Sequence, residues 1–179
     1  MEILSHGSFP RSGNHLLDTV LKFSYPSNNV HWVEHNAWLS DKTQNFICVV
    51  RQPSDAICSW ILLSSDNRYD RSDRLLNWYI RYHEYMLNKK DVLLINFDQL
   101  ISDPSCVNKL IYDKYNIKNV YDIPKDFYDV YMKFSYPENS PIDKRGGNKA
   151  IINEIKQSSE YADANKIYKK ILKRIKNEF

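Results

Sequence analysis

Residues 8–15 read SFPRSGNH, and this segment determines how the rest of the sequence is interpreted. A short strand is predicted before it, at residues 2–8. After it, apolar residues recur at helical spacing from Leu16 to Phe23, so a helix is predicted to begin near Gly13. A strand, a loop and a helix in this order place backbone N–H groups and a helix N-terminus at the end of a parallel strand. Such an arrangement binds phosphate or sulfate.

The loop differs from the nucleotide-triphosphate loop, which reads GxxxxGK followed by Ser or Thr. Gly7 and Gly13 are one residue too far apart, and Asn14-His15 stands in place of the Lys-Ser or Lys-Thr pair. The segment therefore lacks the usual lysine and the usual magnesium-binding hydroxyl, although Arg11 supplies a cation inside the loop. Taken alone, the segment is also explained by an ordinary Pro/Gly turn between a strand and a helix.

Outward from this loop, strands and helices alternate along the sequence. The further predicted strands are residues 30–35, 46–50 and 92–95, and the further predicted helices are residues 53–63, 72–88, 104–115 and 151–177. Residues 46–50 form a continuous apolar run, which is typical of a buried parallel strand. Residues 122–149 contain three prolines and are predicted to be irregular. The alternation predicts an α/β fold, with a central parallel sheet flanked by helices in a single domain over residues 1–179.

The composition excludes several classes of protein. Hydrophobic residues make up 42% of the chain, which indicates a globular protein and not a disordered one. The net charge of +3 suits an anionic small ligand but is too weak to predict nucleic-acid binding without a localised basic patch. We expect no transmembrane segment, because no apolar run approaches the roughly 20 residues of a membrane span. We expect no signal peptide, because the N-terminal residues do not show a charged stretch followed by an apolar one. The three cysteines follow no metal-binding spacing, so we expect reduced thiols, no zinc site and a cytoplasmic location.

A second segment with anion-binding chemistry, VVRQPSDAICS, covers residues 49–59. Arg51 follows a predicted strand, where its planar guanidinium is well placed to hold a phosphate. Ser59 lies about two turns into the helix that is predicted to begin near Pro53, so its hydroxyl is expected to reach the same phosphate. The alternatives are a surface ion pair between Arg51 and Asp55, and a Ser59 hydroxyl bonded to its own helix backbone.

Both segments resemble motifs of the sulfotransferases that use 3′-phosphoadenosine 5′-phosphosulfate (PAPS). Residues 9–14 are similar to the phosphosulfate-binding loop of this family, in which Arg11 takes a position often held by lysine. Residues 51–59 are similar to its 3′-phosphate motif, with Arg and Ser eight residues apart. The resemblance implies a P-loop-NTPase-like domain whose residues 8–15 bind the donor. The loop residues that it assigns to the donor are Arg11, Ser12, Gly13, Asn14 and His15.

Two shorter stretches extend the resemblance towards the C-terminus. Residues 95–104 are similar to the family stretch Y-E-D-L followed by D-P, and Phe97 stands where a tyrosine often stacks on the adenine base. Lys144-Arg145-Gly146 is similar to the basic loop that closes over the nucleotide. The resemblance therefore adds Phe97, Lys144, Arg145 and Gly146 to Arg51 and Ser59 as nucleotide-binding residues.

A histidine is expected to serve as the general base. His35 falls at the C-terminal end of the predicted strand 30–35, where open α/β sheets bind ligands, and near the position of the family's catalytic histidine. A solvated strand-end histidine is the simpler alternative for His35, and His15 is an alternative base. Arg11 cannot deprotonate, so its catalytic role is expected to be electrostatic.

These expectations combine into one function and two alternatives. The chain is expected to transfer a sulfuryl group from PAPS to a hydroxyl or amine of an unknown acceptor, either a small molecule or a glycan, without a metal ion. A nucleotide or small-molecule kinase with a degenerate P-loop is the first alternative, which a requirement for ATP and magnesium would favour. A nucleotide-binding protein without catalytic activity is the second. The sequence does not indicate the acceptor or the oligomeric state.

Overall fold

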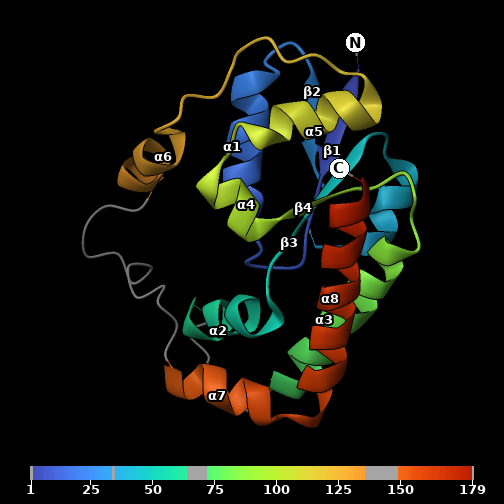
Figure 1. Ribbon diagram of the computed structural model, residues 1–179, viewed down its shortest axis with the longest axis vertical. Helices are drawn as coiled ribbons and strands as arrows, with labels where there is room; N and C mark the ends of the chain where they lie inside the picture. The colour runs from blue at the N-terminus through green and yellow to red at the C-terminus, as the bar shows by residue number, and fades with distance from the viewer. Residues whose placement is uncertain (1, 34, 64–71, 136–148, 179) are drawn as a thin grey trace.

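The structure, a computed structural model, describes residues 2–33, 35–63, 72–135 and 149–178. Its centre is a four-stranded sheet in which all neighbouring strands are parallel, in the order β2-β1-β3-β4 (Figure 1). The strands are β1 (Ile3–His6), β2 (Asn29–Trp32), β3 (Phe46–Val50) and β4 (Leu93–Asn96). Helices flank this sheet, so the predicted α/β architecture with a central parallel sheet is confirmed.

The apolar run of β3 places this strand in the middle of the hydrophobic core. All five of its residues are buried, and their side chains alternate between the two faces of the sheet. Phe46, Cys48 and Val50 belong to the core on one face, whereas Ile47 and Val49 belong to the core on the other. By contrast, β2 is mostly exposed because it lies at the edge of the sheet.

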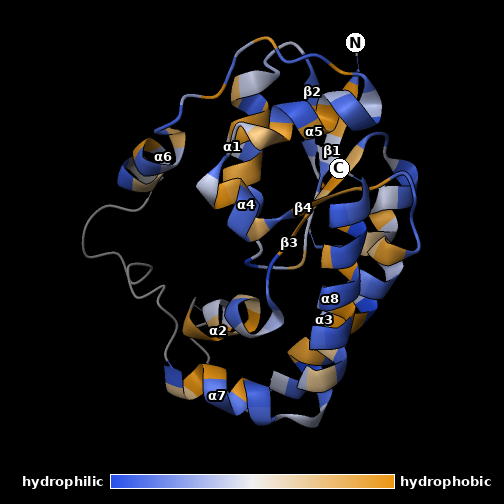
Figure 2. Cartoon of the chain, viewed as in Figure 1, coloured by the Kyte–Doolittle hydropathy of each residue, from blue (hydrophilic) through white to orange (hydrophobic). Residues whose placement is uncertain are grey.

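Two groups of helices cover the two faces of the sheet. The first group packs with Phe46, Cys48 and Val50 and consists of α2 (Pro53–Leu63), α3 (Ser72–Leu87), α7 (Lys149–Gln157) and α8 (Ser159–Glu178). The second group packs with Ile47 and Val49 and consists of α1 (Asn14–Ser24), α4 (Phe97–Ser102), α5 (Cys106–Tyr115) and α6 (Phe127–Ser135). A short 3₁₀ helix, η1 (Ala37–Lys42), connects β2 to β3. Figure 2 shows hydrophilic and hydrophobic residues mixed along each helix, as expected for helices that bury one face only.

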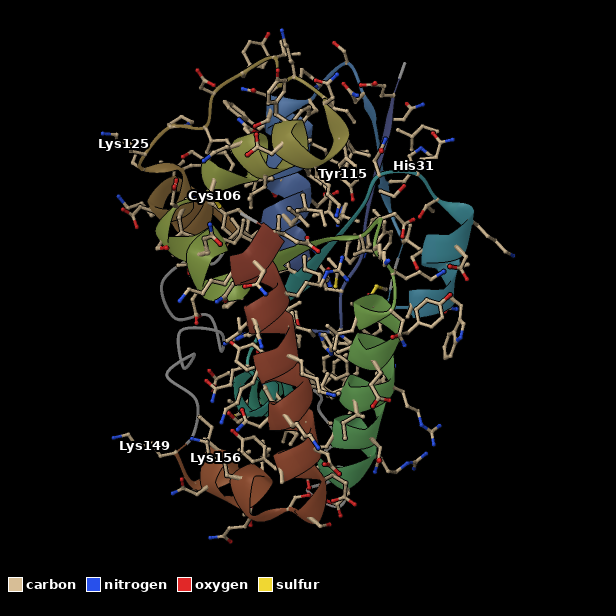
Figure 3. All side chains as sticks on the ribbon, turned by 45° about the vertical axis from the view of Figure 1, so that its right-hand side comes forward. His31, Cys106, Tyr115, Lys125, Lys149 and Lys156 are labelled. Atoms are coloured by element: carbon tan, nitrogen blue, oxygen red, sulfur yellow. The ribbon has the colours of Figure 1, made fainter. Side chains whose placement is uncertain are left out.

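One tyrosine ties the second group of helices to the start of two strands. The Tyr115 hydroxyl, on the last residue of α5, donates to the carbonyl oxygen of Phe46 at 2.6 Å and accepts from the Leu93 N–H at 3.0 Å. Tyr115 is labelled in Figure 3, where it extends from α5 towards the sheet. These bonds fix the N-terminal ends of β3 and β4, so that their C-terminal ends are held side by side at the opposite edge.

Several predicted boundaries are wrong. The predicted strand 30–35 ends at Trp32. The predicted irregular segment 122–149 contains α6, because its prolines flank this helix and do not interrupt it. The predicted helix 151–177 is divided into α7 and α8 at Ser158, whose hydroxyl donates to Asp73 at 2.5 Å. The short helix α4 was not predicted, and Asn96 caps it by accepting from the Asp98 N–H.

Within the described ranges, no helix is both long enough and apolar enough to cross a membrane. The three cysteines are free thiols, and Cys48 and Cys58 are buried in the core between β3 and α2.

Candidate functional site

A cavity of about 450 Å³ lies at the edge of the sheet where the parallel strands end. Most of the residues predicted to bind the donor or to act in catalysis line it, together with residues that were not predicted. The lining residues are Pro10, Arg11, Gly13, Asn14, His15, Leu16, Trp32, His35, Arg51, Ser59, Trp60, Phe97, Ile101, Tyr128 and Tyr131. The volume falls in the range of ordinary small-molecule sites.

The loop after β1 has an unusual backbone. Arg11 has a φ of 63° and Gly13 a φ of 99°, so two residues of the loop adopt the left-handed conformation. This conformation is uncommon for a residue with a side chain, and such strain is concentrated at functional sites. A Cβ atom on Gly13 would lie 2.7 Å from the ring of Phe97, so this position also has no space for a side chain. Turns of this kind direct successive N–H groups to one side, where they bind anions.

The first turn of α1 faces the cavity. Asn14, His15 and Leu16 line the cavity, and the residue before them, Gly13, provides no side-chain cap for the helix. The first turn of α1 also contains no acidic residue. The positive end of the helix dipole is therefore uncompensated by the helix itself, which favours an anion at this end.

Arg51 is fixed at both ends. Its Nη1 donates to the backbone carbonyl of Arg11 at 3.1 Å, and its guanidinium lies 4.5 Å above the centre of the Phe97 ring. The Tyr79 hydroxyl donates to the backbone carbonyl of Arg51 at 2.7 Å. The guanidinium is thus held on the cavity wall beside the loop.

Ser59 lies on the wall of the same cavity but has a different neighbour from the one expected. The Nε–H of Arg11 donates to the Ser59 hydroxyl oxygen at 3.4 Å, so α2 is connected to the loop through this pair. Because the hydroxyl accepts this bond, its own hydrogen can still be donated elsewhere. The structure therefore brings Arg11, Arg51 and Ser59 together around one space.

His35 is held by a backbone carbonyl. Its Nδ1 lies 2.8 Å from the carbonyl oxygen of Ser8, which can only accept. Nδ1 must therefore carry the proton, and a neutral ring has its lone pair on Nε2. The Asn14 side-chain N–H also donates to the Ser8 oxygen, at 3.4 Å. His35 lies three residues beyond the end of β2, so it belongs to a loop and not to the strand end as predicted, yet it lines the cavity.

His15 also lines the cavity, in the first turn of α1. Its ring contacts Trp32 edge-on, with 4.8 Å between the ring centres. Partial burial and, next, the positive charge of Arg11 lower the pKa of His15 below 6.5. The ring is therefore neutral at physiological pH. His31, which shares the predicted strand with His35, is on the exposed side of β2 and does not line the cavity (Figure 3).

Other predicted donor-binding residues have different positions. The Ser12 side chain is fully buried behind the loop and does not line the cavity, and the Ser12 N–H donates to the carbonyl of Phe9 at 3.2 Å. Lys144, Arg145 and Gly146 lie outside the described residues.

The aromatic part of the cavity wall was not predicted from the sequence. Trp32 and Trp60 come from β2 and α2, and Tyr128 and Tyr131 come from α6. The two tyrosines are three residues apart, so a helix would place them on one face. This spacing was the available signal for α6, and the three prolines around it concealed it.

No protein family model and no curated protein matches this sequence. In the described part of the chain, no three His, Cys, Asp or Glu side chains are grouped closely enough to hold a metal ion.

Proposed function

We propose that this chain is a P-loop-NTPase-like sulfotransferase that transfers a sulfuryl group from PAPS to the hydroxyl or amine of an acceptor. The observation that carries the proposal is the cavity itself. It combines two guanidinium groups, an uncapped helix N-terminus and a histidine with a fixed tautomer at the edge where open α/β sheets bind ligands. Motifs from two separate parts of the sequence therefore meet in one space.

The order of the strands suggests how the donor lies. In the order β2-β1-β3-β4, His35 follows β2, the strained loop follows β1, Arg51 follows β3, and Phe97 follows β4. The histidine and Phe97 thus follow the two edge strands of the sheet, and the two arginines follow the two strands between them. A donor with its base near β4 and its sulfate near β1 would direct the sulfate towards His35.

Arg51 and Ser59 would bind the 3′-phosphate. This phosphate carries nearly two negative charges at neutral pH, by analogy with a phosphorylated hydroxyl, and a guanidinium fork matches its geometry. Arg51 is kept in position by the Arg11 carbonyl and the Phe97 ring. It is therefore preorganised, which reduces the entropy lost on binding.

An apolar wall would bind the adenine base. Phe97, Ile101, Tyr128 and Tyr131 line the cavity, from α4 and α6. Flat aromatic surfaces of this kind bind a nucleotide base by stacking.

Arg11 and the backbone N–H groups at the start of α1 would stabilise the negative charge that develops during transfer. The donor supplies an activated sulfuryl group and leaves as 3′-phosphoadenosine 5′-phosphate. A fixed positive charge and fixed N–H groups are effective because they need no reorganisation as the charge moves. The Ser12 N–H is bonded to Phe9, so the contributing groups would be those of Gly13, Asn14 and His15.

His35 would accept the acceptor's proton on Nε2. The Ser8 carbonyl binds the proton on Nδ1 and would stabilise the imidazolium that forms. One proton then moves from the acceptor to Nε2 as the acceptor oxygen or nitrogen bonds to sulfur and the bond to the 5′-phosphate breaks.

A thermal-shift comparison of three ligands tests this proposal against its alternatives. 3′-Phosphoadenosine 5′-phosphate at 100 times its dissociation constant should stabilise the protein by about 2.7 kcal/mol, and adenosine 5′-phosphate at the same concentration should stabilise it much less. A larger effect of ATP with magnesium would instead identify a kinase. Strong binding of the bisphosphate without transfer of labelled sulfate to any of a panel of alcohols and amines would identify a binding protein without catalytic activity.

A further inference from the structure

The outer side of α8 carries five exposed lysines, which we call the lysine row. Its members are Lys166, Lys169, Lys170, Lys173 and Lys176. Figure 1 shows α8 along the outside of the first group of helices, beside α3. A helix has 3.6 residues per turn, so these positions fall on one side of α8 and extend over about 15 Å. The row therefore presents its ammonium groups to the surroundings along a straight line.

The other side of α8 packs against the rest of the protein. Its buried residues are Ala164, Ile167, Tyr168 and Ile171. The one arginine of α8, Arg174, also faces inwards, because its Nη2 donates to the carbonyl oxygen of Val92 at 2.9 Å and its Nε pairs with Glu178 at 2.5 Å. The fold therefore accounts for the apolar side of α8 and for its arginine, but not for the lysine row.

The positive charges of the row are not neutralised by neighbouring carboxylates. None of the five lysines forms an ion pair with a described residue. The acidic residues of α8 lie near its ends, and the sequence between positions 164 and 177 contains no Asp or Glu. The helix dipole favours basic residues in the last turn only. It therefore does not explain Lys166 and Lys169, which lie in the middle of α8.

The row holds more positive charge than the net charge of the whole chain. That net charge is +3, so the chain without these five positive charges would have a net charge of −2. The protein therefore has a localised basic patch, which its overall charge does not reveal. Such an uneven distribution of charge attracts an anionic partner and orients the protein towards it.

A shallow hollow of about 380 Å³ lies within the row. Its lining residues are Ala162, Asn165, Lys166, Lys169, Lys170 and Lys173, and none of these is acidic. The short side chains of Ala162 and Asn165 leave space between the longer lysines. An anionic group that enters this space would meet several ammonium groups and the amide N–H of Asn165.

The chemistry of the row fits anionic lipids better than nucleic acid. A nucleic-acid site usually adds arginine forks or stacking aromatic rings to its positive charge. In α8, the arginine and both tyrosines pack against the rest of the protein. Groups of about four to eight basic residues on a helix are typical of binding to anionic lipids, which requires little more than charge. Because the apolar side of α8 is buried in the core, the helix would lie on the headgroups and not enter the hydrocarbon.

We propose that the lysine row of α8 docks the protein on a membrane surface that carries anionic lipids. The proposal does not depend on the proposed function. No residue of the row lines the 450 Å³ cavity, so the docking surface and the cavity are formed by different residues.

Sedimentation with lipid vesicles tests the proposal on the full chain. The protein should sediment with vesicles of phosphatidylcholine and phosphatidylserine in equal parts, and should stay in solution with phosphatidylcholine alone. Raising the ionic strength from about 0.1 M to about 1 M shortens the Debye length from about 10 Å to about 3 Å, so it should release the protein. Equal sedimentation with both kinds of vesicle, or none with the anionic vesicles at the lower ionic strength, would overturn the proposal.

A pair of substitutions locates the docking surface. Lys169→Gln together with Lys173→Gln should weaken binding to the anionic vesicles about 25-fold, since each lysine near such a surface contributes about a fivefold factor. The matched control is Lys109→Gln together with Lys125→Gln. It removes the same charge from α5 and from the segment just before α6, where Figure 3 labels Lys125. The control should lose much less affinity. Equal losses in the two double variants would mean that only net charge matters, and the docking surface would be disproved.

Fluorescence anisotropy with a labelled single-stranded RNA tests the competing partner. At an ionic strength of about 0.1 M, the RNA should not show saturable binding. Saturable binding that is lost in the Lys169→Gln and Lys173→Gln variant would assign the row to nucleic acid and overturn the proposal. The thermal midpoint of both double variants should equal that of the unchanged chain, because all four lysines are exposed. A loss of vesicle binding that accompanies a lower midpoint would show a structural role for the row instead.

Discussion

The Arg51 guanidinium donates a hydrogen bond to the backbone carbonyl of Arg11 at 3.1 Å, between residues 40 positions apart in the sequence. This bond joins the end of β3 to the strained loop after β1. Because Arg11 in turn contacts Ser59 on α2, the two segments with anion-binding chemistry form one connected unit. Substitution of either arginine should therefore affect the interaction with the anion. Arg51 is expected to act on nucleotide binding, and Arg11 on the transfer step.

Arg51→Ala should weaken the binding of 3′-phosphoadenosine 5′-phosphate by about 1.5–3 kcal/mol, the range for a hydrogen bond to a charged group. Binding of adenosine 5′-phosphate should change little, since that ligand lacks the 3′-phosphate. Isothermal calorimetry with both ligands measures the difference. Arg74→Ala, at an exposed position on α3, removes the same charge away from the cavity and should change neither affinity. Equal losses for both ligands in Arg51→Ala would mean that Arg51 supports the loop and does not recognise the 3′-phosphate.

Arg11→Ala should lower turnover more than it weakens nucleotide binding. If Arg11 stabilises charge that appears only during transfer, its loss should reduce kcat by about a hundredfold or more. Calorimetry with 3′-phosphoadenosine 5′-phosphate gives the ground-state affinity for comparison. A variant with weak nucleotide binding and normal kcat at saturation would limit Arg11 to binding the donor.

Gly13→Ala should destabilise the protein by about 1–3 kcal/mol, because Gly13 has a φ of 99°. Its new methyl group would also meet Phe97 at 2.7 Å. Two urea-unfolding comparisons separate the two causes. The first compares Gly13→Ala with the unchanged chain, and the second compares the double variant Gly13→Ala with Phe97→Ala against Phe97→Ala alone. The second comparison should show a smaller loss, because only the backbone strain remains. An unchanged midpoint in Gly13→Ala would mean that the loop does not need its left-handed conformation.

The sequence predicted the central elements of the fold well, because their signals are local. Residues 46–50 and 53–63 were predicted as a strand and a helix, and β3 and α2 have these same boundaries. An uninterrupted apolar run identifies a buried parallel strand, and Pro53 occupies the first position of a helix, where its missing N–H costs nothing.

The remaining errors concern features that depend on contacts distant in the sequence. The end of β2 at Trp32 is set by its pairing with β1, which ends at His6 opposite Trp32. Likewise, the sequence alone could not place the aromatic side chains of α6 in the cavity, because they reach it only when α6 packs against the second group of helices. The cavity thus contains predicted residues such as Arg11 and Arg51 together with an aromatic wall that was not predicted.

The buried His83 should make the protein sensitive to acid. Complete burial lowers its pKa to about 4 from 6.5, and its Nδ1 is bonded to the Tyr79 carbonyl at 2.8 Å. The unfolded chain binds a proton on His83 more readily than the folded chain does, so protonation favours unfolding. The free energy of unfolding is therefore fully retained above pH 6.5 and decreases as the pH falls towards 4. The loss between pH 7 and pH 5 should be about 2 kcal/mol.

Urea unfolding at several pH values checks that the free energy of unfolding decreases as the pH falls. His83→Leu should flatten the fall in stability between pH 7 and pH 5. His31→Gln, at an exposed position, should not change it. An equally steep fall in His83→Leu would assign the acid sensitivity to other groups, such as His6.

His35→Ala should reduce kcat by about a hundred- to ten-thousandfold, the usual range for a general base. The affinity for 3′-phosphoadenosine 5′-phosphate should be nearly unchanged, since the imidazole is proposed to face the acceptor. His35→Asn is the sharper variant, because its amide can still donate to the Ser8 carbonyl but has no group in place of Nε2. It should be as inactive as His35→Ala while the loop remains intact.

His15→Ala is the necessary comparison, because His15 also has a neutral ring on the cavity wall. Unlike the His35 ring, the His15 ring contacts an indole, that of Trp32, and no carbonyl of the described residues fixes which of its nitrogens carries the proton. His15→Ala should therefore retain most of kcat, and added imidazole should restore activity to His35→Ala by filling the space that the side chain leaves. If instead His15→Ala is inactive and His35→Asn is active, the base belongs to the first turn of α1, and the Ser8 carbonyl holds His35 for structural reasons alone.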